Sequence, residues 1–149
     1  MKVSLTAKRE RKHRRSMERT PPVAISKINS ATRGQINVHS YYERAELAHA
    51  CAVKAVQTGF SYLPIARIIK PPRADKVAQL ARQIAIYIMV QGLDIEQRQI
   101  SRMQGRQRTS IHFALQAVER RLECPVFCTA YERMAMQAHT QFEATMGAA

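Results

Sequence analysis

The stretch ISRMQGRQRTSIHFALQAVERRL, residues 100–122, holds a single glycine between two segments with helical patterns. The segment before the glycine predicts a short helix over about residues 95–104. The segment after it predicts a second helix over about residues 109–123, because apolar residues recur at the spacing of one helix face: Ile111, Leu115, Val118 and Leu122. Two helices joined by a tight turn at glycine form the arrangement of a helix-turn-helix.

This turn is rich in side chains that can donate hydrogen bonds to phosphates or bases. In a helix-turn-helix, the first residues of the second helix reach base edges in the major groove. The residues predicted to contact bases are Arg106, Gln107, Arg108, Thr109 and Ser110. Those predicted to contact the DNA backbone are Arg82, Arg98, Arg102 and His112. The alternative interpretation is an exposed pair of basic helices without such a partner.

Upstream of this pair, the chain also predicts helices. Ser40 is a candidate N-cap with Glu43 at the capping-box spacing, and Gly59 is placed to end that helix. A short helix over residues 63–69 is then broken by the segment KPPR, residues 70–73.

The segment ADKVAQLARQIAIYIMVQG, residues 74–92, predicts the central helix. Its apolar residues follow the 3.6-residue period at Val77, Leu80, Ala81, Ile84, Ala85 and Ile88. A last helix begins near Pro125, and its predicted apolar stripe is Phe127, Tyr131, Met134, Ala138 and Phe142. Residues 84–90 are apolar on all sides and fit a buried strand as well, but the length of the segment favours a helix. The predicted fold class is therefore all-α, a compact helical bundle.

The N-terminal part of the chain has a different composition. The segment MKVSLTAKRERKHRRSMERTPP, residues 1–22, carries eight Lys and Arg against two Glu. A segment of this kind has too little apolar surface to fold alone, so it predicts a disordered, flexible basic arm. A plain solubilising tail is the alternative. Residues 23–39 predict a linker, and residues 40–149 predict a helical DNA-binding domain.

The whole chain is strongly basic, with a net charge of +13 over 149 residues and a pI of about 10.4. Such an excess favours a polyanionic partner. Aromatic residues make up only 6% of the chain and Trp is absent, which disfavours single-strand binding by base stacking. The 11 acidic residues show no metal-ligand clustering, which disfavours a nuclease.

Cellular location and cysteine chemistry follow from other features. No segment predicts a membrane span or a secretion signal, so the cytoplasm is expected. Three cysteines, an odd number, fit reduced thiols. Cys124 and Cys128 allow two interpretations, a metal or redox pair and two small apolar residues near a helix start. The scattered histidines favour the second, so no metal is expected.

Two separated motifs resemble the C-terminal DNA-binding domain of the bacterial replication initiator DnaA. That family carries a pattern close to ARQIAMYL, followed by IGRxFGGRDHTTVxHAxxxIE. Residues 81–88, ARQIAIYI, match the first part. The second part is matched by Ile100, Arg102, Gly105, Arg106, Thr109, Ser110, Ile111, Ala114, Val118 and Glu119. The resemblance covers about residues 63–122 and implies an all-helical domain with an extended helix-turn-helix.

The resemblance also implies a basic loop that enters the minor groove of DNA. Lys70, Arg73 and Lys76 occupy that loop, and two prolines are expected to hold it extended. The chain departs from the family at Gln107 and Arg108, where the family has Asp and His, and it keeps only one of the paired glycines. Nothing resembles the initiator's nucleotide-binding module, so no nucleotide and no other cofactor is expected.

These observations predict a sequence-specific double-stranded DNA-binding protein, not an enzyme, that associates with the nucleoid and regulates transcription or replication initiation. An RNA-binding or ribosome-associated basic protein is the alternative. Residues 40–62 and the last helix lie outside the matching core. They allow two interpretations, packing on that core and formation of a homodimer interface.

Overall fold

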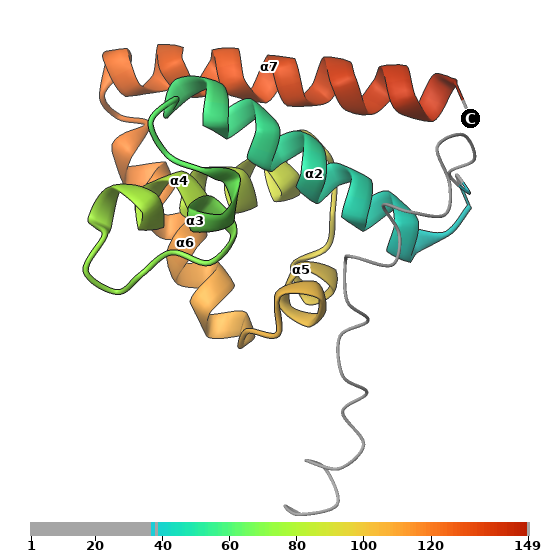
Figure 1. The fold of residues 1–149 in the computed structure, drawn as a ribbon, viewed down its shortest axis with the longest axis horizontal. Coiled ribbons are helices and arrows are strands. Elements are labelled where there is room, and N and C mark those ends of the chain that lie inside the picture. Colours follow the sequence, from blue (N-terminus) through green and yellow to red (C-terminus); the bar gives the residue numbers. More distant parts are fainter. Residues whose placement is uncertain (1–36, 38, 149) are drawn as a thin grey trace, which may run out of the picture.

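The computed structural model describes residue 37 and residues 39–148, and these form a bundle of helices without a strand (Figure 1). The predicted arm over residues 1–22 and most of the predicted linker over residues 23–39 lie outside the described residues. The all-α prediction is therefore confirmed for the part of the chain that the structure describes. No helix in that part is long and apolar enough to cross a membrane.

The first long helix, α2 (Tyr41–Gly59), begins and ends where it was predicted to. The Ser40 hydroxyl accepts a hydrogen bond from the backbone N–H of Glu43 at 3.4 Å, as an N-cap does. The Glu43 carboxylate accepts from the N–H of Asn37 at 2.5 Å. Only half of the capping box is therefore formed, because in a full box this carboxylate would accept from Ser40.

A short helix, α3 (Ile65–Ile69), leads into the predicted basic loop. The loop is not extended throughout, which corrects the prediction. After the two prolines, the N–H of Asp75 donates to the carbonyl of Pro72 at 3.1 Å and closes a turn at Arg73. The amide nitrogen of Gln79 donates to the carbonyls of Pro72 at 3.2 Å and Arg73 at 2.8 Å. These bonds hold the loop against the start of the next helix.

The central helix, α4 (Lys76–Tyr87), is buried along most of its length. It begins at Asp75, whose carboxylate accepts a hydrogen bond from the N–H of Ala78 at 3.0 Å. The predicted stripe was wrong at Val77, whose side chain is 40% exposed. Ile86, outside that stripe, is fully buried. The reason is that α2, α3 and α6 all pack against α4, so its buried surface is wider than one stripe.

A π-helical turn, η2 (Ile88–Gly92), extends α4 and redirects the chain. The N–H of Leu93 donates to the carbonyl of Ile88, five residues earlier, at 3.0 Å. Asp94 follows with a φ of 54°, in the left-handed region. Leu93 and Ile95 are both buried, so the chain returns to the core before the next helix begins. The sequence predicted a regular helix to Gly92. This prediction was wrong for its last five residues, which form the wider π-helical turn.

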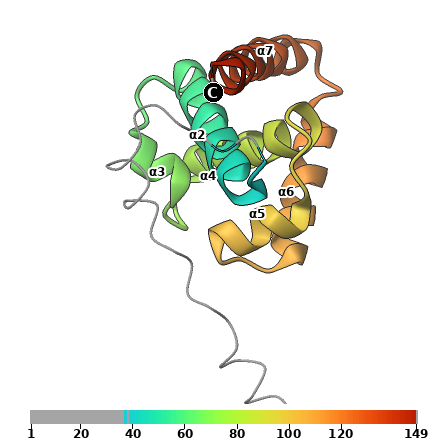
Figure 2. The ribbon, with the colours of Figure 1, turned by 90° about the vertical axis from the view of Figure 1, so that its right-hand side faces the viewer.

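The last helix, α7 (Pro125–Gly147), lies beside α2 at the top of Figure 1, and Figure 2 shows the same pair from another side. The residues of its predicted stripe are buried or partly buried against the core: Phe127, Tyr131, Met134, Ala138 and Phe142. The helices α2 and α7 therefore pack against each other within one chain, as the first of the two interpretations expects.

Two further helices, α5 (Gln97–Gln104) and α6 (Arg108–Arg121), complete the bundle. Their ends lie within two residues of the predicted ones. The buried face of α6 packs against α4 and α5 and consists of Ile111, Ala114, Leu115 and Val118. In both views the α5–α6 turn and the loop after α3 lie on the side of the molecule opposite α7 (Figures 1 and 2).

Candidate nucleic-acid interface

The chain reverses between α5 and α6 through a turn centred on Gly105, which has a φ of 62°. The N–H of Gly105 donates to the carbonyl of Arg102 at 3.3 Å, and the N–H of Arg106 donates to the carbonyl of Ser101 at 3.0 Å. This pair of bonds is a Schellman motif, which ends a helix at a left-handed residue. The Ser101 hydroxyl also donates to the carbonyl of Arg106. The direction of α6 relative to α5 is thus fixed by local hydrogen bonds.

Replacing Gly105 with Ala is expected to lower the free energy of unfolding by about 1–2 kcal/mol, because a left-handed conformation strains an L side chain. A Cβ atom at this position would meet no other atom within 4 Å, so the loss comes from the backbone alone. Gly147→Ala is the matched control, since its Cβ is equally free and no left-handed φ is present. Urea titrations of both variants check this, and equal stabilities would contradict it.

The five residues predicted to contact bases lie together at the start of α6. Arg106, Gln107, Arg108 and Thr109 are exposed, and Ser110 is half-buried. Gln107 is the N-cap residue, but its side chain makes no capping hydrogen bond, and the first turn contains no acid. The helix therefore presents open backbone N–H groups and positive side chains on the same side, a combination that favours anions.

Three of the four residues predicted to contact the DNA backbone are also exposed: Arg98, Arg102 and His112. The two arginines lie one helical turn apart on α5. No acidic residue occurs anywhere between Glu96 and Glu119. The segment that contains the turn is therefore positively charged throughout.

Arg82, the fourth predicted backbone contact, was placed wrongly. Its side chain is 7% exposed, and its Nη2 donates a hydrogen bond to Oε1 of Gln104 at 2.7 Å. Its Nε is buried without a hydrogen-bond partner among the described residues. Its position on α4 faces the end of α5, which no pattern within one helix can reveal. Arg82 therefore links α4 to Gln104, the residue before Gly105, and helps to hold the α5–α6 turn in place.

The buried charge of Arg82 affects its surroundings. The pKa of Arg82 is lowered to about 10, mainly by burial and to a smaller extent by the charge of Arg106. Arg82 therefore stays charged at neutral pH. Neither ion pair found in the described part of the chain includes Arg82. Burial, and after it the charge of Arg82, lowers the pKa of His49 on α2. Sequence reasoning missed both Gln104 and His49, since their roles depend on contacts between distant segments.

The free energy of unfolding is expected to fall as the pH drops below about 6.5, the usual pKa of histidine in an unfolded chain. Below that pH, His49 takes up a proton in the unfolded chain but not in the folded chain, where its pKa is lowered. The free energy of unfolding therefore keeps falling until the pH reaches the lowered pKa. The slope can reach about 1.4 kcal/mol per pH unit. Chemical unfolding between about pH 7.5 and 5.5 measures it.

The matched variants for this titration are His49→Gln and His112→Gln. His49 is buried and His112 is exposed. We expect the first substitution to flatten the pH dependence and the second to leave it unchanged. An unaltered slope in His49→Gln would show that other groups cause the loss.

The three basic residues of the predicted minor-groove loop, Lys70, Arg73 and Lys76, are all exposed. The nearby Asp75 does not neutralise them, because its carboxylate already caps α4 and pairs with Arg67 at 3.4 Å. The loop and the α5–α6 turn thus form two separate basic sites on one side of the molecule (Figures 1 and 2).

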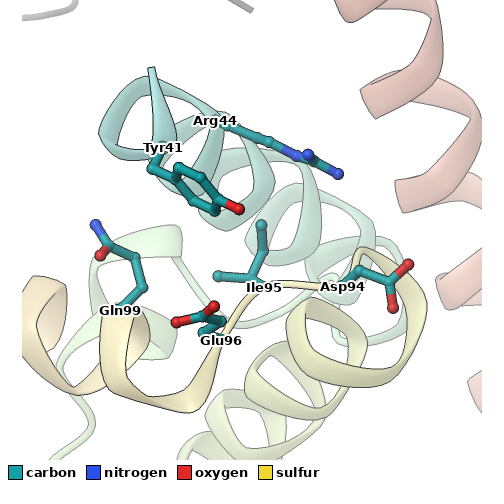
Figure 3. Close-up of a pocket in the computed structure, with 6 residues that line it drawn as sticks. All are labelled: Tyr41, Arg44, Asp94, Ile95, Glu96 and Gln99. Carbon is teal, nitrogen blue, oxygen red and sulfur yellow. The ribbon is translucent and has the colours of Figure 1, made fainter. Parts of the chain in front are cut away.

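A small hollow lies between the start of α2 and the segment before α5 (Figure 3). It has a volume of about 150 Å³ and is lined by Tyr41, Arg44, Asp94, Ile95, Glu96 and Gln99. Drug-sized ligands occupy pockets of roughly 300–1,000 Å³. The Arg44 guanidinium points toward α7, where it lies 5.8 Å from the centre of the Phe142 ring. The hollow therefore does not indicate a small-molecule site.

Cys124 is the N-cap residue of α7, and Cys128 lies in its first turn. Among the described residues, no group of three His, Cys, Asp or Glu side chains could hold a metal ion. The Cys128 thiol donates to the Glu132 carboxylate at 3.6 Å. Desolvation and the charge of Glu132 raise the pKa of Cys128, which keeps the thiol protonated and weakly reactive.

Comparisons of the chain with protein-family models, with curated proteins and with solved structures found no match. The resemblance to the initiator domain stays a prediction from two sequence motifs. What the chain does is therefore inferred from its own residues.

Proposed function

We propose that the chain is a sequence-specific double-stranded DNA-binding protein, and that α5 and α6 act as an initiator-type helix-turn-helix. The observation that carries the proposal is the exposed start of α6, where Arg106 and Arg108 lie beside an uncapped helix N-terminus in a segment without acids. Charge of this kind suits phosphates, and the planar donors of arginine suit the acceptors of guanine.

The proposal gives each part of the basic side its own role. The start of α6 enters the major groove, where residues 106–110 contact base edges. Arg98, Arg102 and His112 hold the backbone that borders the groove. Arg82 makes no DNA contact and keeps the turn in place through Gln104.

The loop after α3 supplies a second contact in this proposal. Lys70, Arg73 and Lys76 enter the adjacent minor groove, where narrow A·T-rich segments attract basic side chains. Two contacts on one side of the domain would fix both its position and its direction along the duplex. Binding to a specific DNA sequence is what a regulator of transcription or of a replication origin in the bacterial nucleoid requires.

Competition between duplex DNA and structured RNA tests this proposal against RNA binding. A-form RNA has a deep, narrow major groove that α6 cannot enter. A labelled duplex bound to the full chain should therefore be displaced by unlabelled duplex DNA at much lower concentration than by a hairpin RNA of equal length and charge. Equal or better displacement by the hairpin would replace the proposal with the RNA-binding alternative.

A further inference from the structure

Phe113 is a large apolar side chain on the polar face of α6. It is 67% exposed, whereas the neighbouring Ile111 and Ala114 are buried. Leaving a Phe ring in water gives up the hydrophobic stabilisation that burial provides. Single exposed apolar residues are nevertheless common on protein surfaces. The residues around Phe113 therefore determine whether its exposure indicates a contact with a partner.

Those surroundings belong to the candidate interface. Thr109, a predicted base contact, lies four residues earlier and so on the same helix face. The His112 ring centre is 6.4 Å from that of Phe113. Arg106 and Arg108 lie in the same acid-free segment. Other strongly exposed apolar side chains, such as Met136 on α7, lack this setting.

We propose that Phe113 contacts the C5-methyl group of a thymine in the major groove and thereby helps to determine the sequence that is bound. This inference rests on the proposed function. Thymine is the one base that presents a methyl group in the major groove, and apolar side chains recognise it by direct contact. No other unmodified base carries a methyl group at this edge, so thymine is the natural counterpart of a phenyl ring on this helix face.

Helix and duplex dimensions place that thymine. Four residues along a helix rise about 6 Å, so Phe113 lies about that far beyond Thr109. Base pairs are stacked about 3.4 Å apart. The thymine is therefore expected one to two base pairs from the pair that Thr109 contacts. The initiator pattern has a histidine at the position of Phe113, so this contact is expected to distinguish the chain from that family.

The test begins with a duplex that the full chain selects from a random pool. Each thymine is then replaced by uracil, which lacks only the methyl group. One replacement should weaken wild-type binding by about fourfold, the value expected for the burial of one methyl-sized group. Phe113→Ala should weaken binding to the thymine duplex, and it should no longer distinguish thymine from uracil at that position. Phe113→Leu, which keeps an apolar contact, should still distinguish them.

Met136→Ala is the control, since Met136 is 72% exposed on α7, the helix that lies opposite the α5–α6 turn (Figure 1), and the variant should bind like wild type. Thermal unfolding verifies that each variant is folded, which is expected because Phe113 is exposed. If Phe113→Ala keeps the full preference for thymine over uracil, or if wild type has none, the methyl contact is wrong while duplex binding stands. No binding to any duplex would reject the proposed function as well.

Discussion

The full chain is expected to lose roughly 10³–10⁵ in affinity for duplex DNA when the salt concentration rises from about 50 to about 200 mM. Each phosphate that a Lys or Arg side chain neutralises releases condensed counterions, and salt opposes that release. A net charge of +13, with exposed basic residues at the α5–α6 turn and in the loop after α3, is consistent with roughly 6–10 such contacts. Fluorescence anisotropy titrations at four or more salt concentrations measure the slope.

Charge removal inside and outside the interface provides the control. Arg98→Ala and Arg102→Ala should each reduce the salt slope by about 0.9, the value for one lost phosphate contact. Arg133→Ala removes an exposed charge from α7, on the opposite side, and should leave the slope unchanged. Nearly constant wild-type affinity over this salt range would contradict an electrostatic mode of binding.

Arg106→Ala and Arg108→Ala are expected to reduce the preference for the selected site over random DNA by roughly 5- to 150-fold. This range corresponds to about 1–3 kcal/mol, the discrimination that one bidentate base contact provides. Both side chains are exposed at the start of α6, where major-groove contacts are made. The ratio of the two dissociation constants, for the selected and for a random duplex, measures the change in each variant.

Arg98→Ala and Arg102→Ala are the matched variants on α5. They should weaken binding to both duplexes about equally, because phosphate contacts carry no sequence information. If all four substitutions produced equal losses on both duplexes, α6 would have no role in sequence recognition.

Features that depend on neighbouring residues in the sequence were predictable. Ser40 caps α2, Gly59 ends it and Pro125 begins α7, since caps and breakers act within a few residues. Gly105 marks the reversal between α5 and α6 for the same reason, because only a left-handed residue satisfies the last carbonyls of α5 in this way. The exposed base-contact candidates at the start of α6 followed from that turn.

Features that depend on packing between distant segments were not predictable. Arg82 was expected at the surface, but its side chain is buried and Gln104 at the end of α5 accepts its hydrogen bond. The π-turn at the end of α4 brings Leu93 and Ile95 into the core. The apolar run over residues 84–90 does not predict this turn, because the turn depends on how the following segment packs in the bundle. Phe113 was not among the predicted contacts, because the apolar period of α6 identifies its buried stripe and gives no role to an apolar residue outside it.

Selection from a pool of random duplexes, carried out in parallel with wild type and with the double variant Gln107→Asp, Arg108→His, tests the central claim most directly. Gln107 suits adenine and Arg108 suits guanine, whereas the Asp of the initiator family suits the amino group of cytosine. We expect wild type to enrich one motif, with adenine or guanine beneath the start of α6 and different from the initiator's own site, and the double variant to lose that preference. Enrichment of the initiator's site by wild type, the same motif from both proteins, or no motif at all would contradict recognition through these residues.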